Sequence, residues 1–374
     1  MSSWLVYQFR GIIINFNIFL IQGRKTPQAT IFSSRPIIFL AVINSYILIK
    51  ALIKYTCRHI DWKRYVVRIA IIGQSAFGEA VLKELVGKHE NIVGVFCPPD
   101  KKNQPQDPIK VTAQSNNIPV FQFSRMRDSQ CIETFKSLFS DLCIMAYVID
   151  IVPDQILIAP TKGTIQYHPS LLPKHRGPSS INWSIINGDK ETGFTIFWPD
   201  GDLDTGPILY QEIIDIAQND STGSLYFKKL FPRGVDALIE SVEMVRNGTA
   251  PKIEQDHSKA TYEGWCKGKD VIIDWDKPVG SIHDLIRGSD PSPGARTYIN
   301  GGELRLYGSA IVSCVNKDQP GEVIQITEEG MMISCHGGVL RIKKVKPASQ
   351  NKCTVVEWAK TFSIEPGFRF GNTK

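Results

Sequence analysis

A histidine and an aspartate stand out as residues that could carry acid–base chemistry. His168 ends the apolar run TIQYH (164–168) and precedes a proline, so we expect it at the carboxyl end of a sheet strand. Asp204 lies in the turn DGDLDTG (200–206), after the next expected strand. Taken singly, a structural histidine and a plain turn are the ordinary interpretations. Together, an imidazole that exchanges a proton near neutral pH and a carboxylate that orders water predict one acid–base pair.

Other catalytic signatures in the sequence are incomplete. The turn GQSAFG (73–78) lacks the middle glycine of a dinucleotide fingerprint and has Glu79 where a phosphate-binding loop has lysine. It also fails the pattern of a nucleophile elbow around Ser75, so a tight turn that starts a helix is the ordinary interpretation. Asp-Thr-Gly occurs once, whereas an aspartic protease needs two such aspartates. The eight cysteines form no C-x-x-C pair, which argues against a zinc knuckle.

The elements that must position the pair alternate between strands and helices. Continuous apolar runs predict buried strands, and the stretches between them have helical spacing. The expected strands are 67–73, 91–97, 118–123, 141–148, 164–168, 192–199 and 207–216, and the expected helices include 77–87, 109–117 and 224–248. This alternation predicts an α/β catalytic domain over residues 67–268 with a doubly wound, mostly parallel sheet.

The remainder of the chain has a different texture on either side of this domain. Residues 269–374 contain short strands separated by Gly, Asn and Asp, which predicts a small β-rich, OB-like domain. Residues 1–66 carry nine basic side chains and one acid, with apolar stretches at 11–21 and 36–49. The second stretch is shorter than the roughly 20 residues that a spanning helix needs. A transit-type leader, a membrane anchor and an unstructured extension all stay open.

Charge separates the extension from the rest of the chain. The formal net charge is +6, but the 308 residues after the extension hold 34 basic and 36 acidic groups, a net of −2. A surface that tracks phosphates needs a basic excess in the folded part, so extended nucleic-acid binding is not expected.

Several segments together resemble the folate-dependent formyl-transfer family. They are HPSLLPKHRG (168–177), INWSIINGD (181–189), TGFTIFW (192–198) and DLDTGPIL (202–209). The resemblance extends from about residue 67 to the end and is strongest to the amino-terminal hydrolase domain of the 10-formyltetrahydrofolate dehydrogenases. The sequence is also similar to the methionyl-tRNA formyltransferases. The histidine box followed by Leu-Asp-Thr-Gly, with Asp204 36 residues after His168, is highly specific.

The resemblance implies a substrate and catalytic roles. The substrate would be 10-formyltetrahydrofolate, which water would cleave to formate and tetrahydrofolate. His168 matches the family's proton donor, and Asp204 matches the carboxylate that positions and activates water. The family has asparagine or an aliphatic residue where this chain has Gln166. The Gln166 amide could donate to the oxyanion, although its extra methylene displaces the donor, or it could point to the opposite face and solvent.

The resemblance also implies a folate pocket beside the segment before the histidine. The matching residues are Asp150, where the family has glutamine, Ile151 and Val152. The loop after the histidine would add Ser170, Leu171, Arg176 and Gly177. We expect Arg176 and Gly177 to shape this loop, and a solvated position is the ordinary alternative for Arg176.

Three functional hypotheses stay open at this point. The first is a 10-formyltetrahydrofolate hydrolase without a metal and without an NADP site in this chain. The second is a methionyl-tRNA formyltransferase, and the third is an inactive folate-binding fragment. We expect a cytoplasmic enzyme, or a mitochondrial one if residues 1–66 are a leader, with membrane contact only if they are an anchor. Self-association into a homo-oligomer and continuation into a longer dehydrogenase also stay open.

Overall fold

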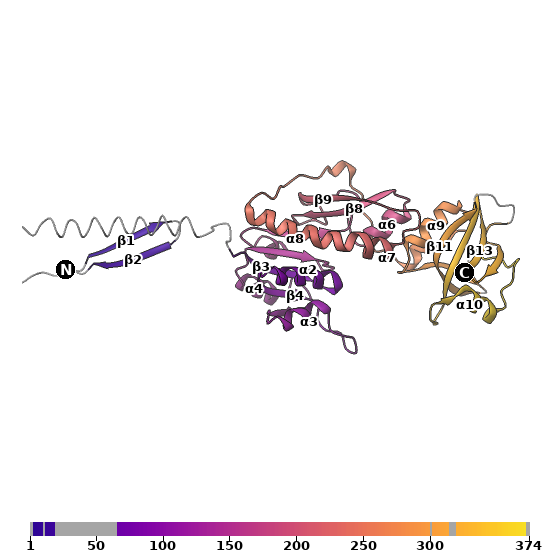
Figure 1. The fold of residues 1–374 in the computed structure, drawn as a ribbon, viewed down its shortest axis with the longest axis horizontal. Helices are drawn as coiled ribbons and strands as arrows, with labels where there is room; N and C mark the ends of the chain where they lie inside the picture. Colours follow the sequence, from indigo (N-terminus) through magenta and orange to yellow (C-terminus); the bar gives the residue numbers. More distant parts are fainter. Residues whose placement is uncertain (1–2, 10–11, 19–65, 300, 314–318, 372–374) are drawn as a thin grey trace, which may run out of the picture. The chain divides into compact units, whose positions relative to one another are not determined.

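A computed structural model of the chain describes residues 3–9, 12–18, 66–299, 301–313 and 319–371 (Figure 1). Residues 1–64 and 65–374 form two separate units. In the first, strands β1 (Ser3–Phe9) and β2 (Ile12–Ile18) pair as an antiparallel hairpin. The apolar stretch 36–49 lies outside the described residues. Among the residues that are described, no helix has the length and apolar character needed to cross a bilayer.

A seven-stranded sheet forms the centre of the second unit. Its strands, in chain order, are β3 (Arg68–Gly73), β4 (Asn91–Cys97), β5 (Val120–Gln122), β6 (Leu142–Ala146), β7 (Thr164–His168), β8 (Glu191–Phe197) and β9 (Ile208–Asp215). The spatial order is β5-β4-β3-β6-β7-β8-β9, with β5 to β7 parallel and β8 and β9 antiparallel. The order reverses around β3, so the carboxyl ends of β3, β6 and β7 border the crevice where such sheets bind ligands.

Helices cover both faces of this sheet. On one face, α2 (Ser75–Gly87), α3 (Pro108–Ser115) and α8 (Phe231–Asn247) enclose the larger apolar core. On the other face, α4 (Ser129–Ser137) and α5 (Asp154–Leu157) enclose a smaller one. Short helix α6 (Ser180–Ile186) follows the loop after β7. The expected mostly parallel α/β sheet is therefore confirmed.

The helix expected at 224–248 is interrupted in the structure. It is divided into α7 (Thr222–Leu225), a π-helical turn (Tyr226–Leu230) and α8. The interruption lies where three aromatic rings are in contact. The centroid of the Tyr226 ring is 5.0 Å from that of Phe227 and 5.6 Å from that of Phe231. Helical spacing alone does not reveal such a change of hydrogen-bond register.

A separate antiparallel sheet forms the C-terminal domain, as expected. Its strands are β10 (Ala295–Ile299), β11 (Gly302–Ser313), β12 (Val323–Thr327), β13 (Gly330–Cys335), β14 (Gly338–Pro347) and β15 (Cys353–Thr354). Two helices that we did not expect, α9 (Val279–Gly288) and α10 (Val355–Phe362), contribute to its core. Two 3-10 turns, His257–Lys259 and Gly268–Val271, lie in the segment that joins the domains.

Helix α9 connects the C-terminal domain to the catalytic domain through buried polar groups. The two ring nitrogens of His283 lie 2.8 Å from Oγ of Ser309 on β11 and 3.0 Å from the carbonyl oxygen of Gln218 after β9. Arg287 donates to the carbonyl of Ala217 at 3.2 Å. Burial lowers the pKa of His283 from 6.5, and the nearby Arg287 charge acts in the same direction.

Close packing of α8 on β7 predicts the effect of a single methyl group. A Cβ at Gly234 would lie 2.4 Å from the Tyr167 ring, whereas a Cβ at Gly87 of α2 would meet nothing within 4 Å. We expect Gly234→Ala to lower the free energy of unfolding by about 1–3 kcal/mol through overpacking. The matched Gly87→Ala should be neutral or stabilise by up to about 1 kcal/mol. Urea unfolding of the full chain measures both, and equal midpoints would contradict this packing.

The lowered pKa of His283 predicts a loss of stability in mild acid. Below about pH 6.5, His283 takes up a proton in the unfolded chain while it stays neutral in the folded one, so the unfolded state is favoured. The penalty grows as the pH falls to the folded pKa and is constant below it. We expect the melting temperature to fall less between pH 7.5 and pH 5.5 in His283→Gln than in the unsubstituted chain. Identical pH profiles would contradict this.

Candidate active site

The structure brings His168 and Asp204 together from two segments of the chain. His168 is the last residue of β7, and Asp204 lies in the turn between β8 and β9. Nδ1 of the imidazole is 3.5 Å from Oδ2 of the carboxylate, and each residue is only 6% exposed. This separation is longer than the roughly 2.7–2.9 Å of a charge-assisted hydrogen bond. The two groups therefore face each other without forming a tight ion pair.

The main chain fixes the protonation pattern of the His168 ring. Its Nε2 lies 2.8 Å from the carbonyl oxygen of His175. Because a carbonyl oxygen only accepts, Nε2 is the nitrogen that carries the proton in the neutral ring. Nδ1, which faces Asp204, is then the nitrogen that can gain or lose a proton.

Asp204 is held in place from both its side chain and its backbone. Its Oδ2 accepts the backbone N–H of Gly177 at 2.8 Å. Its φ of 55° lies in the left-handed region, which is uncommon for a residue other than glycine. The Gln255 side-chain amide supports this conformation by donating to the carbonyls of Asp204 at 2.9 Å and Gly206 at 2.7 Å. Among the described residues no donor lies on Oδ1 of Asp204, so this oxygen is available to accept a hydrogen bond.

Ser170 and Leu171 belong to the internal framework of the loop after β7. Ser170 is fully buried, and its hydroxyl donates to the carbonyl of Lys174 at 2.7 Å. Thr195 of β8 donates to the Ser170 carbonyl at 2.7 Å and accepts from the backbone N–H of Leu172 at 3.2 Å. Leu171 lies against β8, where a Cβ at Gly193 would come within 2.5 Å of it. These contacts shape the loop.

Arg176 is buried, so its interpretation as a solvated residue is wrong. It is 1% exposed, and its guanidinium donates to the Tyr262 hydroxyl and, at 2.7 Å, to the Gln255 side chain. His257 Nδ1 is a further partner at 3.0 Å. Arg176 thus ties the catalytic loop to the segment that leads to the C-terminal domain. The neighbouring Gly177 has φ of 99°, and a Cβ there would lie 2.4 Å from the Glu263 carbonyl, so this position requires glycine.

Gln166 lies on the face of β7 that carries His168. Successive side chains of a strand alternate between faces, and Ile165 and Tyr167 pack into the core under α2 and α8. This arrangement differs from the interpretation in which Gln166 points to the face opposite His168. Its side chain is half-buried and has no hydrogen-bond partner among the described residues. The amide is therefore available to a ligand near His168.

The segment after β6 presents apolar side chains at the same edge of the sheet. Ile149 and Ile151 are 58% and 77% exposed, while Val152 is buried. The Asp150 carboxylate accepts the backbone N–H groups of Met126 at 2.7 Å and Ile151 at 2.9 Å. Asp150 is therefore occupied in holding the segment, and the exposed isoleucines are what it offers to a ligand.

Four residues that hold this site were not identified from the sequence. The His175 carbonyl bonds to His168, and Thr195, Gln255 and Glu263 bond to the catalytic loop or turn. His175 stands inside the HPSLLPKHRG box and could have been found there. Gln255 and Glu263 lie in an irregular segment where no strand or helix periodicity indicates which side chains turn toward the catalytic loop.

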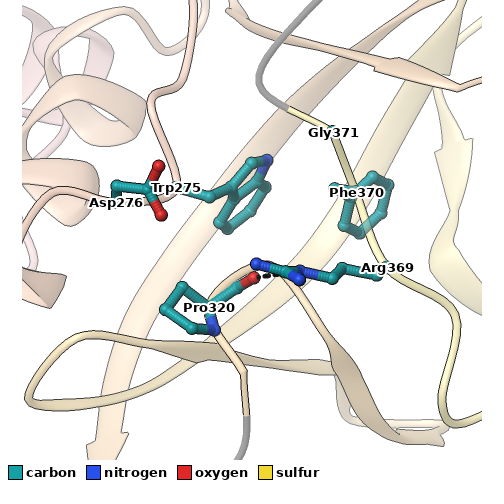
Figure 2. A pocket seen from close by; sticks show the side chains of 6 residues that line it. All are labelled: Trp275, Asp276, Pro320, Arg369, Phe370 and Gly371. Atoms are coloured by element: carbon teal, nitrogen blue, oxygen red, sulfur yellow. Dashed lines mark hydrogen bonds between the residues drawn. The ribbon is translucent and has the colours of Figure 1, made fainter.

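A separate cavity of about 270 Å³ lies in the C-terminal domain (Figure 2). It is lined by Trp275, Asp276, Pro320, Arg369, Phe370 and Gly371. Arg369 donates to the Pro320 carbonyl at 2.9 Å. None of the residues predicted for the active site lines it. Within the part of the chain that the structure describes, no group of three His, Cys, Asp or Glu side chains could hold a metal ion.

Two curated relatives show where the chain is similar to known proteins. It is 40% identical to mitochondrial 10-formyltetrahydrofolate dehydrogenase of Mus musculus over 71% of this chain and 29% of that protein. The chain thus spans less than a third of that relative. It is 31% identical to methionyl-tRNA formyltransferase of Geobacter sulfurreducens over 81% of this chain and 96% of that protein.

Solved structures and family models agree with the fold. HypX from Aquifex aeolicus, in complex with tetrahydrofolic acid, superposes with a TM-score of 0.60 at 17% identity, covering 79% of this chain and 47% of that chain. Residues 67–242 match the formyl transferase model, and residues 267–363 match the model of the formyl transferase C-terminal domain. The chain belongs to the formyl transferase family.

Proposed function

We propose that the chain hydrolyses 10-formyltetrahydrofolate to tetrahydrofolate and formate. The observation that carries this proposal is the buried pair of His168 and Asp204, which face each other at 3.5 Å at the ligand-binding edge of the sheet. Similarity to a 10-formyltetrahydrofolate dehydrogenase and to a structure that holds tetrahydrofolic acid supports a folate substrate.

Asp204 would position the attacking water. Its Oδ2 is already bonded to the Gly177 N–H, and Oδ1 can accept a hydrogen bond from water. The water oxygen attacks the formyl carbon to give a tetrahedral intermediate, and Asp204 orients the water and assists removal of its proton.

His168 would supply the proton that the leaving nitrogen needs. Nε2 keeps its own proton on the His175 carbonyl, so the transferred proton is one that Nδ1 first takes up to give the imidazolium. When the bond between the formyl carbon and N10 breaks, N10 takes up this proton and leaves as the amine of tetrahydrofolate. The formyl group departs with the water oxygen as formate. One of the two water protons replaces the proton that His168 gave, and the other is released to solvent.

Two further groups would complete the site. The Gln166 amide, unpartnered among the described residues and on the face of His168, would donate to the oxyanion of the intermediate. The exposed Ile149 and Ile151 would lie against the pterin ring, while backbone groups of residues 150–152 would bond to its polar edge. Asp150 would act by holding this segment through Met126.

A methionyl-tRNA formyltransferase is the second candidate, favoured by the match over nearly the full length of the Geobacter sulfurreducens enzyme. In that reaction the attacking group is an amine in place of water. Incubating the full chain with 10-formyltetrahydrofolate, with and without charged initiator tRNA, separates the candidates. Formate release without tRNA supports the hydrolase, transfer to tRNA supports the second candidate, and folate binding without turnover indicates an inactive module. Location in the cytosol or in mitochondria stays a prediction.

Replacing Asp204 should abolish most formate release. Asp204→Asn keeps the shape and an oxygen for the Gly177 N–H but removes the negative charge, so we expect kcat to fall about 100- to 10,000-fold. Asp202→Asn in the same turn is the matched control, because Asp202 is exposed. Formate release from 10-formyltetrahydrofolate measures both. A D204N enzyme with the activity of D202N would disprove the assignment.

Replacing Gln166 tests the oxyanion contact. Gln166→Leu removes the amide while keeping a side chain of similar size, so we expect kcat to fall about 100-fold with KM nearly unchanged. Steady-state kinetics of formate release measure the two parameters separately. If kcat is unchanged, Gln166 does not donate to the intermediate, and the oxyanion is stabilised by other groups.

A further inference from the structure

A second buried histidine lies seven residues after the catalytic one. His175 is 7% exposed, and its ring is held between two acidic side chains from different segments. Nε2 is 2.7 Å from Oδ2 of Asp189, which follows α6, and Nδ1 is 3.1 Å from Oε1 of Glu263, in the segment that joins the domains. A carboxylate thus lies within hydrogen-bond distance of each ring nitrogen, so the ring is held from two sides.

This histidine contacts the proposed catalytic pair through its backbone. The His175 carbonyl is the group that accepts from Nε2 of His168 at 2.8 Å. When one imidazole nitrogen donates to a carbonyl, that hydrogen bond fixes the tautomer and the orientation of the ring, and the other nitrogen is left for proton exchange. The position of the His175 carbonyl therefore keeps Nε2 engaged and leaves Nδ1 as the nitrogen that faces Asp204 and can take up and release a proton.

The backbone at His175 needs such support. Its φ of 54° lies in the left-handed region, which residues other than glycine adopt at a cost. The backbone N–H of His175 donates to Oγ1 of Thr261 at 2.8 Å, and that of Arg176 donates to the Thr261 carbonyl at 2.9 Å. With the ring bonded to Asp189 and Glu263 as well, every polar group of His175 has a partner.

We propose that His175 is a positioning residue for His168, and that Asp189 and Glu263 act through it. The inference rests on the proposed function, because it assigns a task within that reaction. It also makes a statement about the His168 ring that does not depend on turnover: His175, held by two carboxylates, keeps the His168 proton on Nε2.

The experiment combines kinetics with the ¹⁵N signals of labelled histidines in the full chain. The His168 signal is assigned with His168→Asn. In the unsubstituted chain, at a pH at which the His168 ring is neutral, we expect its proton to lie on Nε2. In His175→Leu we expect a mixture of the two tautomers, with kcat reduced about 100-fold, the effect of a misplacement of about 1 Å, and KM changed less than twofold. His175→Gln, which keeps one donor, should recover at least tenfold of the lost kcat.

The neighbouring Lys174→Ala serves as the matched control, because this side chain is exposed and only its backbone bonds within the loop. It should leave both kcat and the His168 signal unchanged. The proposal is overturned if His175→Leu keeps the original kcat, or if its kcat falls while His168 stays fully protonated on Nε2.

A second variant keeps the proposal testable if His175→Leu does not fold. Asp189→Asn with Glu263→Gln preserves shape and removes both negative charges around the ring. We expect kcat to fall about tenfold at constant KM, with the same change in the His168 signal. An unchanged signal overturns the proposal. Should the unsubstituted chain release no formate, the proposed function fails, while the His168 signals in these variants still decide the role of His175.

Discussion

The hydrogen bond from Nε2 of His168 to the His175 carbonyl determines what the rest of the site can do. An imidazole has two nitrogens, and engaging one of them leaves the other for proton exchange. Here the engaged nitrogen points into the loop, and the other faces Asp204 at 3.5 Å. The gap is wide enough that neither group is neutralised by a tight ion pair, so both can act on a ligand placed between them and the open edge of the sheet.

Polar side chains support the loop that provides this carbonyl. Irregular backbone in the interior has no ladder of its own, and its N–H and C=O groups must find other partners. The Thr195 hydroxyl bonds to the backbone of Ser170 and Leu172, and the Gln255 amide donates to the carbonyls of Asp204 and Gly206. Burial of the Arg176 guanidinium is compensated by its hydrogen bonds to Gln255, His257 and Tyr262. The framework of the site is thus a polar one that surrounds the carboxyl end of β7.

The sequence is informative wherever a residue's role follows from a local pattern. Continuous apolar runs predict the parallel strands, and His168 at the end of such a run is correctly expected at the edge of the sheet. Patterning also indicates the β-rich C-terminal domain. Helix α10 is not expected from the pattern of short strands around it, although Thr354 and Glu357, three residues apart, form a capping box at its start.

What the sequence could not reveal depends on contacts between distant segments. The burial of Arg176 follows from residues about 80 positions further along the chain, and the double anchoring of His175 comes from Asp189 and Glu263. The half-buried Gln166 could have been placed by strand alternation alone, since it stands two residues before His168. The π-helical turn Tyr226–Leu230 coincides with contacts between aromatic rings that no sequence periodicity encodes.

The route of the chain between the two domains has a consequence for modular evolution. Residues 255–264 run beside the loop after β7, where Arg176 pairs with Tyr262 and the Trp183 indole donates to the Gly264 carbonyl at 2.7 Å. This connector is built into the catalytic loop. A recombination junction between α8 and Gly264 would therefore discard part of the scaffold that holds the catalytic loop.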